Sequence, residues 1–514
     1  MDKEKILIPP LFDVDYILEH IDWELVKSKF HEEQYGDAQV LTHLFSNPVR
    51  RLVCVKSSKQ KGDWFYWDWI DDVQTKTGVW KKDDGTLVLS TIPSILPKIY
   101  EKMLPQLPQH LWALVHSRIH QLRRVGYQKG VLEQSKSFLY DPEFMGTLDA
   151  DPNLLSVANG VLDLTSGIFR PATPDDRIHI RAPTLWKGWE EPCVEWERVI
   201  NEMMNGDKTL VRFIQDTIGN GLRGDNLQHI FLVFFGGTHT GKSVILNIMN
   251  GLLGGTYYKP MSRDVLIQSK FGHSEGSHTN HWVDLIGSRI ATYSETTAQT
   301  KLNEESIKNV TGEDTITVRP IWGKEMQYKP GFLPLMITNF VPMLSFQDEA
   351  LWTRIAIVPF RVRFSDRIDD RIDETDEDDD LDEGISTVCV KPIQRGLSTC
   401  LLANEASGIL RWFMQGCIRV ANEGLERPPI VQKTTQRARR ALDDVDEWLY
   451  DWKRTTKCVT RANILYHDYR EWCCRNHRII QLSTMTAFGT YLAHKKRIPK
   501  NRNNKGMMYA LEKI

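Results

Sequence analysis

A strand, a glycine-rich loop and a helix are predicted in direct succession at residues 228–253, QHIFLVFFGGTHTGKSVILNIMNGLL. Residues 230–235 form an apolar run rich in β-branched and aromatic side chains, which is typical of a buried strand. The run stops at two glycines, and from Lys242 onward apolar residues recur at helical spacing. A strand that leads through a glycine loop into a helix is the setting of a phosphate-binding loop.

The loop residues 236–243, GGTHTGKS, fit the pattern G-x-x-x-x-G-K-S. Glycines let successive backbone N–H groups turn toward phosphate oxygens, and the start of the helix adds its positive dipole end. Lys242 would reach the β- and γ-phosphates of ATP, and Ser243 would bind Mg²⁺. A chance match is the alternative, and the flanking strand and helix argue against it. The predicted nucleotide-binding residues are Gly236, Gly237, Thr238, His239, Thr240, Gly241, Lys242 and Ser243.

Length and composition point to several domains without a membrane segment. The chain has 514 residues, of which 41% are hydrophobic, so three or four domains are expected. The amino terminus does not resemble a signal peptide, and no apolar run is long enough to span a membrane. Eight scattered cysteines without a C-x-x-C motif suit a reducing compartment and argue against a zinc site. We therefore expect a soluble, cytoplasmic protein with no membrane contact.

The net charge of −2 hides two opposite segments. Residues 365–383 contain twelve acidic residues and two arginines, a local net charge of −10, so the rest of the chain carries +8. Residues 435–514 contain seventeen Lys and Arg against eight Asp and Glu. The acidic run has few apolar residues to bury, so we expect a disordered loop there. The basic carboxyl-terminal segment suggests contact with nucleic acid.

Two other clusters have both a functional and a structural interpretation. Tryptophans are dense at residues 62–70, GDWFYWDWI, where they could stack bases, although a core role is the more common one. Arg118, Arg123, Arg124 and Lys129 fall in a region that looks helical, and they are most simply a solvated face.

Three polar residues at strand ends follow the glycine loop. Glu295 comes after the strand-like run RIATYS, Asn339 after FLPLMIT, and Arg354 opens a further apolar strand. Hydrolysis of a nucleotide needs a carboxylate to orient water or metal, a polar sensor, and a cation for the developing charge. Each residue alone is weak evidence, but their order behind a phosphate-binding loop predicts a hydrolytic site. The predicted catalytic residues are thus Lys242, Glu295, Asn339 and Arg354.

Longer stretches around these residues resemble the superfamily 3 helicases. They are RIATYSETTAQTKLNEESIKNVTGEDTITVRP, PLMITNFVP and DEALWTRIAIVPF. They are most similar to the primase-helicases of poxviruses and other large DNA viruses, and to replication proteins of satellite phages and plasmids. The flanking segments DPNLLSVANGVLDLTSG, ASGILRWFMQGC and DVDEWL also resemble that branch. The resemblance covers about residues 60–514, and no primase motif is visible.

The resemblance implies an α/β fold with an AAA+-like P-loop ATPase core. Gly236, Gly241, Lys242 and Ser243 match the Walker A loop. Glu295 matches the Walker B acid, which would bind Mg²⁺ directly or through water, and Asn339 matches the sensor of motif C. Arg354 matches the finger that reaches a neighbouring subunit's nucleotide. Many motors have an additional acidic residue where this chain has Ser294, so metal binding would rest on Ser243 and water.

A predicted hairpin at residues 315–328 matches the family's DNA-contacting pore loop. Lys324 lies at its tip, where it could meet a phosphate, and Trp322 could lie against sugars or bases. Arg319 and Lys308 are weaker candidates for DNA contact. The alternative is a surface hairpin with an ordinary glycine turn.

The resemblance and the composition together predict six segments. These are a Trp-rich α+β region (1–100), a mostly helical region that precedes the motor (101–205), the helicase core (206–364), an acidic disordered insert (365–396), a helical connector (397–430) and a basic winged-helix-like region (431–514).

We expect an ATP-dependent replicative DNA helicase that forms a ring of six subunits. The family pattern implies translocation on single-stranded DNA in the 3′ to 5′ direction, action on forked DNA, and a primase or polymerase as a candidate partner. One alternative is a ring ATPase that moves or remodels DNA–protein complexes without unwinding. Another is a DNA-binding scaffold in which nucleotide only locks assembly.

Overall fold

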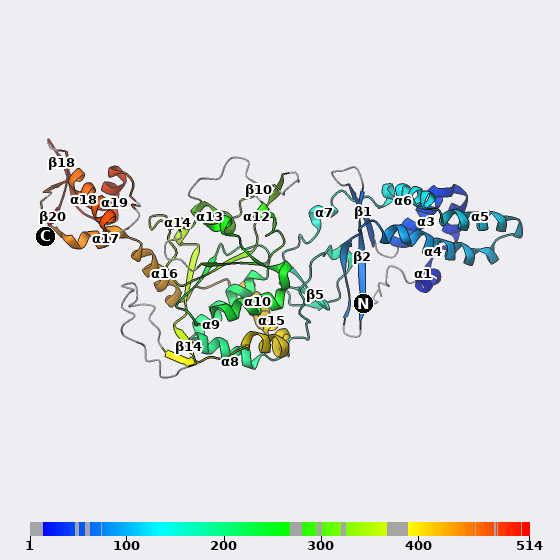
Figure 1. The fold of residues 1–514 in the computed structure, drawn as a ribbon, viewed down its shortest axis with the longest axis horizontal. Helices are drawn as coiled ribbons and strands as arrows, with labels where there is room; N and C mark the ends of the chain where they lie inside the picture. The colour runs from blue at the N-terminus through cyan, green and yellow to red at the C-terminus, as the bar shows by residue number, and fades with distance from the viewer. Residues whose placement is uncertain are drawn as a thin grey trace.

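The computed structural model describes residues 14–46, 51–56, 62–72, 75–267, 280–295, 301–319, 325–366, 389–457, 459–476, 480, 482–504 and 506–514. Figure 1 shows an elongated chain with a helical end, a central α/β part and a smaller carboxyl-terminal part. The described residues contain no helix both long and apolar enough to cross a membrane.

The amino-terminal part is a helical bundle with an antiparallel sheet of order β1-β2-β3. Its helices are α1 (Val14–His20), α2 (Trp23–Lys29), α3 (Glu33–Ser46), α4 (Leu87–Met103), α5 (Trp112–Leu122) and α6 (Val125–Leu139). Its strands are β1 (Leu52–Lys56), β2 (Gly62–Asp72) and β3 (Thr75–Lys82). Trp67 and Trp80 of this sheet are buried, so these two rings have the core role.

One core unites α1 to α6, and this contradicts the boundary expected at residue 100. That position lies inside α4, and Leu96 and Leu122 belong to the same buried cluster. Arg118 also departs from the prediction, because it is buried rather than solvated. Its Nη1 donates to Asp37 Oδ1 at 3.0 Å, and the hydroxyls of Tyr100 and Tyr127 also donate to this carboxylate. A buried charge requires such partners.

The segment between the bundle and the central part is not mainly helical. After α7 (Phe144–Thr147) the chain forms a three-stranded antiparallel sheet. Its strands are β4 (Leu154–Val157), β5 (Gly160–Asp163) and β6 (Phe169–Arg170). An extended stretch then leads to α8 (Val194–Met203). The short connection at Asn159–Gly160 produces the hairpin that the sequence suggests.

The central part contains a five-stranded parallel sheet of order β13-β7-β12-β9-β8. The strands are β7 (Phe231–Phe235), β8 (Tyr258–Pro260), β9 (Ile290–Glu295), β12 (Leu333–Thr338) and β13 (Ile355–Pro359). Every residue of β7, β12 and β13 is buried. Parallel strands covered on both faces are expected to be continuous apolar runs, as these are.

Helices cover both faces of this sheet (Figure 1). Leu232 and Phe234 of β7 pack with α9 (Lys208–Gly221), α10 (Lys242–Tyr257) and α15 (Leu397–Glu423). Phe231 and Val233 point to the other face. That face is covered by the short helices α11 (Arg263–Leu266), α12 (Asn280–Val283), α13 (Glu304–Thr311) and α14 (Glu349–Trp352).

Two peripheral strand pairs bear on the sequence predictions. β10 (Ile316–Val318) pairs antiparallel with β11 (Met326–Tyr328), which confirms the hairpin, although its tip at 320–324 lies outside the described residues. β14 (Val362–Ser365) pairs parallel with β15 (Cys389–Pro392). The prediction of a disordered insert at 365–396 is therefore wrong near both of its ends, because Ser365 belongs to β14 and residues 389–392, CVKP, form β15. Residues 367–388 lie outside the described part of the chain.

The carboxyl-terminal part packs around Trp448, Tyr469 and Phe488. Its helices are α16 (Pro429–Ala441), α17 (Asp444–Trp448), α18 (Ala462–Arg475) and α19 (Met485–His494). Two small antiparallel sheets, β16-β20 and β17-β19-β18, complete it. Their strands are β16 (Trp452–Arg454), β17 (Thr460–Arg461), β18 (Lys500–Asn503), β19 (Gly506–Tyr509) and β20 (Leu511–Lys513).

Candidate nucleotide-binding site

The loop between β7 and α10 has a backbone that requires glycine at two positions. Gly236 has a φ of 154°, and a Cβ there would lie 2.3 Å from the carbonyl oxygen of Phe360. Gly241 has a φ of 86° and caps the amino end of α10, where a Cβ would lie 2.9 Å from Met203. Side chains at these positions would strain the backbone or displace its neighbours. Glycine at these positions therefore lets the loop pack closely against Phe360 and against Met203 of α8.

Lys242, the first residue of α10, is folded onto this loop. Its Nζ donates to the carbonyl oxygens of Gly236 and Gly237, each at 2.6 Å, and to Thr240 Oγ1 at 3.0 Å. The side chain is buried, and this desolvation lowers the pKa of the ammonium to about 8. The three acceptors are neutral, so they offset only part of the cost of burying the charge. An anion at the loop would supply the missing negative charge.

The carboxyl ends of three strands are level with this loop. Thr338 of β12 pairs with Phe235 of β7 and with Glu295 of β9. Asn339 and Gly236 follow at the same edge of the sheet, as the sequence predicts for Asn339. Glu295 is placed here by its backbone, and its side chain lies outside the described residues.

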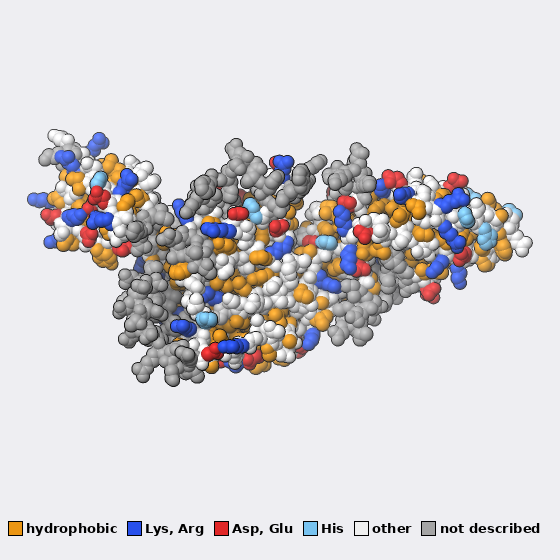
Figure 2. All heavy atoms as spheres, viewed as in Figure 1, with side chains coloured by type: hydrophobic (Ala, Val, Ile, Leu, Met, Phe, Trp, Pro, Cys, Tyr) orange, Lys and Arg blue, Asp and Glu red, His pale blue; other side chains and the backbone are white. Residues whose placement is uncertain are grey.

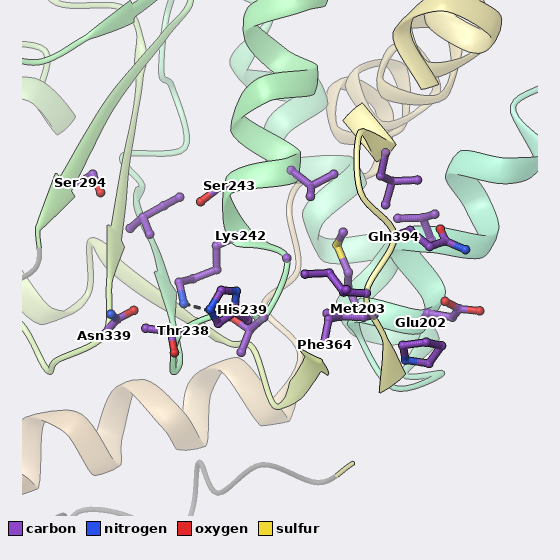
Figure 3. Close-up of a pocket in the computed structure, with 18 residues that line it drawn as sticks. Glu202, Met203, Thr238, His239, Lys242, Ser243, Ser294, Asn339, Phe364 and Gln394 are labelled. Carbon is purple, nitrogen blue, oxygen red and sulfur yellow. Dashed lines mark hydrogen bonds between the residues drawn. The ribbon is translucent and has the colours of Figure 1, made fainter. Parts of the chain in front are cut away.

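A cavity of about 490 Å³ adjoins the loop. Such a volume is typical of a small-molecule site. Thr238 to Ser243 form one wall, and Ser294 and Asn339 line the cavity from the ends of β9 and β12. Figure 3 shows Ser294 and Asn339 on one side of Lys242, with Met203, Phe364 and Gln394 on the other. The structure thus brings together the loop and Asn339, two predicted parts of the site.

The opposite wall is apolar, and no sequence pattern predicted it. It is formed by α8, by Phe364 of β14, and by residues 392–397, which we call the strap. Its apolar members are Val199, Met203, Phe364, Pro392, Ile393 and Leu397. No motif marks these residues, because they converge from segments almost 200 positions apart.

Arg198 fastens the strap to α8. Its guanidinium donates to Gln394 Oε1 of the strap at 3.1 Å and to Glu202 Oε1 at 2.6 Å. Glu202 and Gln394 both line the cavity. A guanidinium has no acceptor, so the Gln394 atom that faces Arg198 must be the carbonyl oxygen. The amide NH₂ group of Gln394 is therefore left for other partners.

Oxygen donors suited to Mg²⁺ border the cavity. The Ser243 hydroxyl is exposed there, and the Ser294 hydroxyl and the Asn339 amide lie across from it. Mg²⁺ prefers oxygen ligands and keeps several waters, so few protein ligands suffice. In the described part of the chain, no three His, Cys, Asp or Glu side chains cluster as a metal site. The donors that are present fit a water-rich magnesium site.

Arg354 lies at the opposite end of the strands, directly before β13 begins. Its carbonyl oxygen accepts a hydrogen bond of 2.9 Å from the Phe231 N–H, where β7 begins. The five residues of β7 span roughly 16 Å, which exceeds the reach of an arginine side chain. The guanidinium Nη1 instead donates to Thr311 Oγ1 at 3.1 Å. The structure does not bring Arg354 to the loop of its own chain.

The four candidate DNA-binding residues have different positions. Lys308 on α13 donates to Asp348 Oδ2 at 2.6 Å. Arg319 is exposed just beyond β10. Trp322 and Lys324 belong to the hairpin tip outside the described residues.

The chain is similar in sequence to a family model and to proteins of large DNA viruses. Residues 38–205 match the family model described as "D5 N terminal like". The chain is 26% identical over 368 residues to "Putative helicase L207/L206" of Acanthamoeba polyphaga mimivirus, covering 70% of this chain and 37% of that protein. It is 21% identical over 259 residues to "Putative primase C962R" of African swine fever virus (isolate Tick/Malawi/Lil 20-1/1983), covering 46% of this chain and 25% of that protein.

These matches support a D5-like superfamily 3 primase-helicase family for this chain. It spans about a quarter to two fifths of the length of these two relatives. Among solved structures, the C-terminal region of NrS-1 (305–718) aligns with 88% of this chain and 96% of its own length, at 10% identity and a TM-score of 0.38.

Proposed function

We propose that this chain is the ATP-driven motor of a replicative DNA helicase that works as a ring. The observation that carries the proposal is the position of Lys242. It lies buried in a glycine loop, with neutral partners only, beside a cavity that Asn339 also lines. The family relationship supports a role in DNA replication, and the names of the two viral relatives support helicase or primase work.

ATP fits the cavity in two parts. The glycine loop would hold the triphosphate, because its backbone N–H groups can donate to phosphate oxygens and Lys242 supplies a cation. The apolar wall between α8 and the strap would bury the base, and Gln394 and Glu202 would meet its polar edge. Mg²⁺, when bound at Ser243, would neutralise phosphate charge.

Two residues at the strand ends would control the attacking water. Glu295 would act as the general base, since a carboxylate at this edge accepts a proton from water. Asn339 would orient that water through its amide, in keeping with its place in the cavity. The level carboxyl ends of β9 and β12 support both proposed roles.

The position of Arg354 favours an assembly in which neighbours complete each site. Because Arg354 lies roughly a strand length from its own loop, it would serve the nucleotide of an adjacent subunit. We propose a hexamer that moves 3′ to 5′ on single-stranded DNA, as in the family. Arg319, Trp322 and Lys324 would contact DNA from the hairpin. A phosphate at Lys308 would have to compete with Asp348.

ATP turnover with and without single-stranded DNA tests the motor. The wild-type chain should hydrolyse ATP faster when DNA is added, and Lys242→Ala should abolish turnover in both conditions. A Lys242→Ala protein that hydrolyses ATP at the wild-type rate would refute the phosphate-loop assignment. Turnover that DNA never stimulates would favour a remodelling ATPase, and binding without turnover would favour a scaffold.

A further inference from the structure

The outer face of α5 exposes aromatic and apolar side chains at the helical end of the molecule (Figure 1). The inner face of α5, with Val115, Ile119 and Leu122, is buried in the bundle core. On the outer face Trp112 is 38% exposed and Leu114 is 53% exposed. The Trp112 indole Nε1 donates to the Leu107 carbonyl oxygen at 3.2 Å, so the ring is anchored although its surface is accessible.

The segment that forms α5 and the start of α6 is cationic and has no carboxylate of its own, although Glu33 acts electrostatically on Tyr127 of α6. From Lys102 to Leu132 the sequence has no Asp or Glu. Arg123, Arg124 and Lys129 are exposed around the turn between α5 and α6 and at the start of α6. Within the described residues none of these three side chains forms an ion pair, in contrast to Lys136, which pairs with Glu133 further along α6. Cations are thus concentrated at the carboxyl end of α5, roughly 16 Å along the helix from the exposed indole at its amino end.

Histidines add further donors along this helix. His116 and His120 are exposed and one helical turn apart, and His110 is exposed just before α5. Figure 2 shows histidine side chains at this end of the molecule, among basic and hydrophobic ones. Arg118 does not contribute, because it lies inside the bundle with Asp37.

We propose that the outer face of α5, together with Arg123, Arg124 and Lys129, binds single-stranded nucleic acid. Proteins that bind single strands without sequence preference combine cations that follow the phosphates with aromatic rings that stack bases. Both elements are present here, and a base can stack on Trp112 only if it is unpaired. Figure 1 places α5 far from α10 and β10, so this surface is separate from the candidate nucleotide-binding site and from the hairpin.

Binding of a fluorescent oligothymidylate without nucleotide tests this surface. Trp112→Ala should weaken binding about fivefold or more, and Trp112→Phe should retain most of the affinity, since stacking contributes at least that much per base. The triple variant Arg123→Gln, Arg124→Gln, Lys129→Gln should reduce the steepness of log affinity against log salt concentration by about 2. Each lost phosphate contact contributes about 0.7 to that slope.

A matched control separates location from net charge. The triple variant Lys27→Gln, Lys29→Gln, Lys81→Gln removes the same charge elsewhere in the amino-terminal part and should bind as wild type does. All variants should keep the wild-type melting temperature and basal ATP turnover. Equal loss of binding in the two triple variants would overturn the proposal, as would equal loss for duplex and single-stranded DNA.

Photocross-linking supplies an independent measurement. An oligonucleotide with 5-iododeoxyuridine should cross-link to peptides from residues 104–132 in the wild-type chain, and less in Trp112→Ala. Cross-links confined to other segments would overturn the proposal. Substitutions that weaken the binding of polyglutamate but not the binding of DNA would also overturn it. Since no step requires ATP, these results do not depend on the proposed motor activity.

Discussion

The affinity for ATP is expected to fall as the pH rises above about 8, because of the buried Lys242 ammonium. Burial lowers the pKa of Lys242 to about 8 when only neutral oxygens surround it. A bound triphosphate favours the charged form and restores the pKa toward its usual value near 10.4. Binding therefore requires protonation of a group that is mostly neutral at pH 9.

The magnitude follows from the two protonation states. With a pKa of about 8 in the free protein, Lys242 is about nine-tenths charged at pH 7 and about one-tenth charged at pH 9. The dissociation constant for Mg-ATP should rise about tenfold between these two values. Phosphate groups, whose second pKa is about 6, contribute little over this range.

Isothermal titration calorimetry at pH 7, 8 and 9 in buffers of different ionisation enthalpy measures the dissociation constant and the number of protons taken up on binding. At pH 9 binding should take up nearly one proton, and at pH 7 about a tenth of a proton. Lys242→Arg is the matched control, since a guanidinium remains charged throughout and should remove the pH dependence. An affinity that is constant from pH 7 to 9, without proton uptake, would refute this account of Lys242.

Three further substitutions test separate parts of the site. Glu295→Gln should bind ATP as the wild type does but lose hydrolysis, and an unchanged rate would move the general base elsewhere. Arg354→Ala should lose turnover, and mixing it with Lys242→Ala should restore some activity, because arginine fingers contribute about 10³ to 10⁵ in rate; no recovery in mixed rings would place Arg354 within its own subunit. Ile393→Asp should weaken ATP binding at least tenfold and inorganic triphosphate binding much less, since it places a charge in the apolar wall; equal weakening of both would contradict the base pocket.

Local sequence patterns predicted the loop and the three strand ends well. An apolar run that ends in Gly236–Gly237 leaves few alternatives, because a fully buried parallel strand must be apolar on both faces. The carboxyl ends of β9 and β12 lie at the same level because the two strands are parallel neighbours. These features depend on short segments, each of which carries its own signal.

Features that depend on distant contacts were missed. The boundary expected at residue 100 separated a Trp-rich region from a helical one, but it falls inside α4, whose residues share a single core with α1 and α5. Arg118 looked like part of a solvated face, because its partner Asp37 is 81 positions away. Most of the strap fell within the segment expected to be a disordered insert (365–396), and its role in the cavity wall depends on the pairing of β15 with β14, which no sequence motif marks.

Strand displacement on forked DNA tests the central claim most directly. A substrate with a 3′ single-stranded tail and a labelled duplex should be unwound by the wild-type chain with ATP. Lys242→Ala should not unwind it, and neither should the wild type without nucleotide. The account also predicts little unwinding of a fork that has only a 5′ tail. ATP turnover stimulated by single-stranded DNA, with no strand displaced on either substrate, would contradict the helicase assignment.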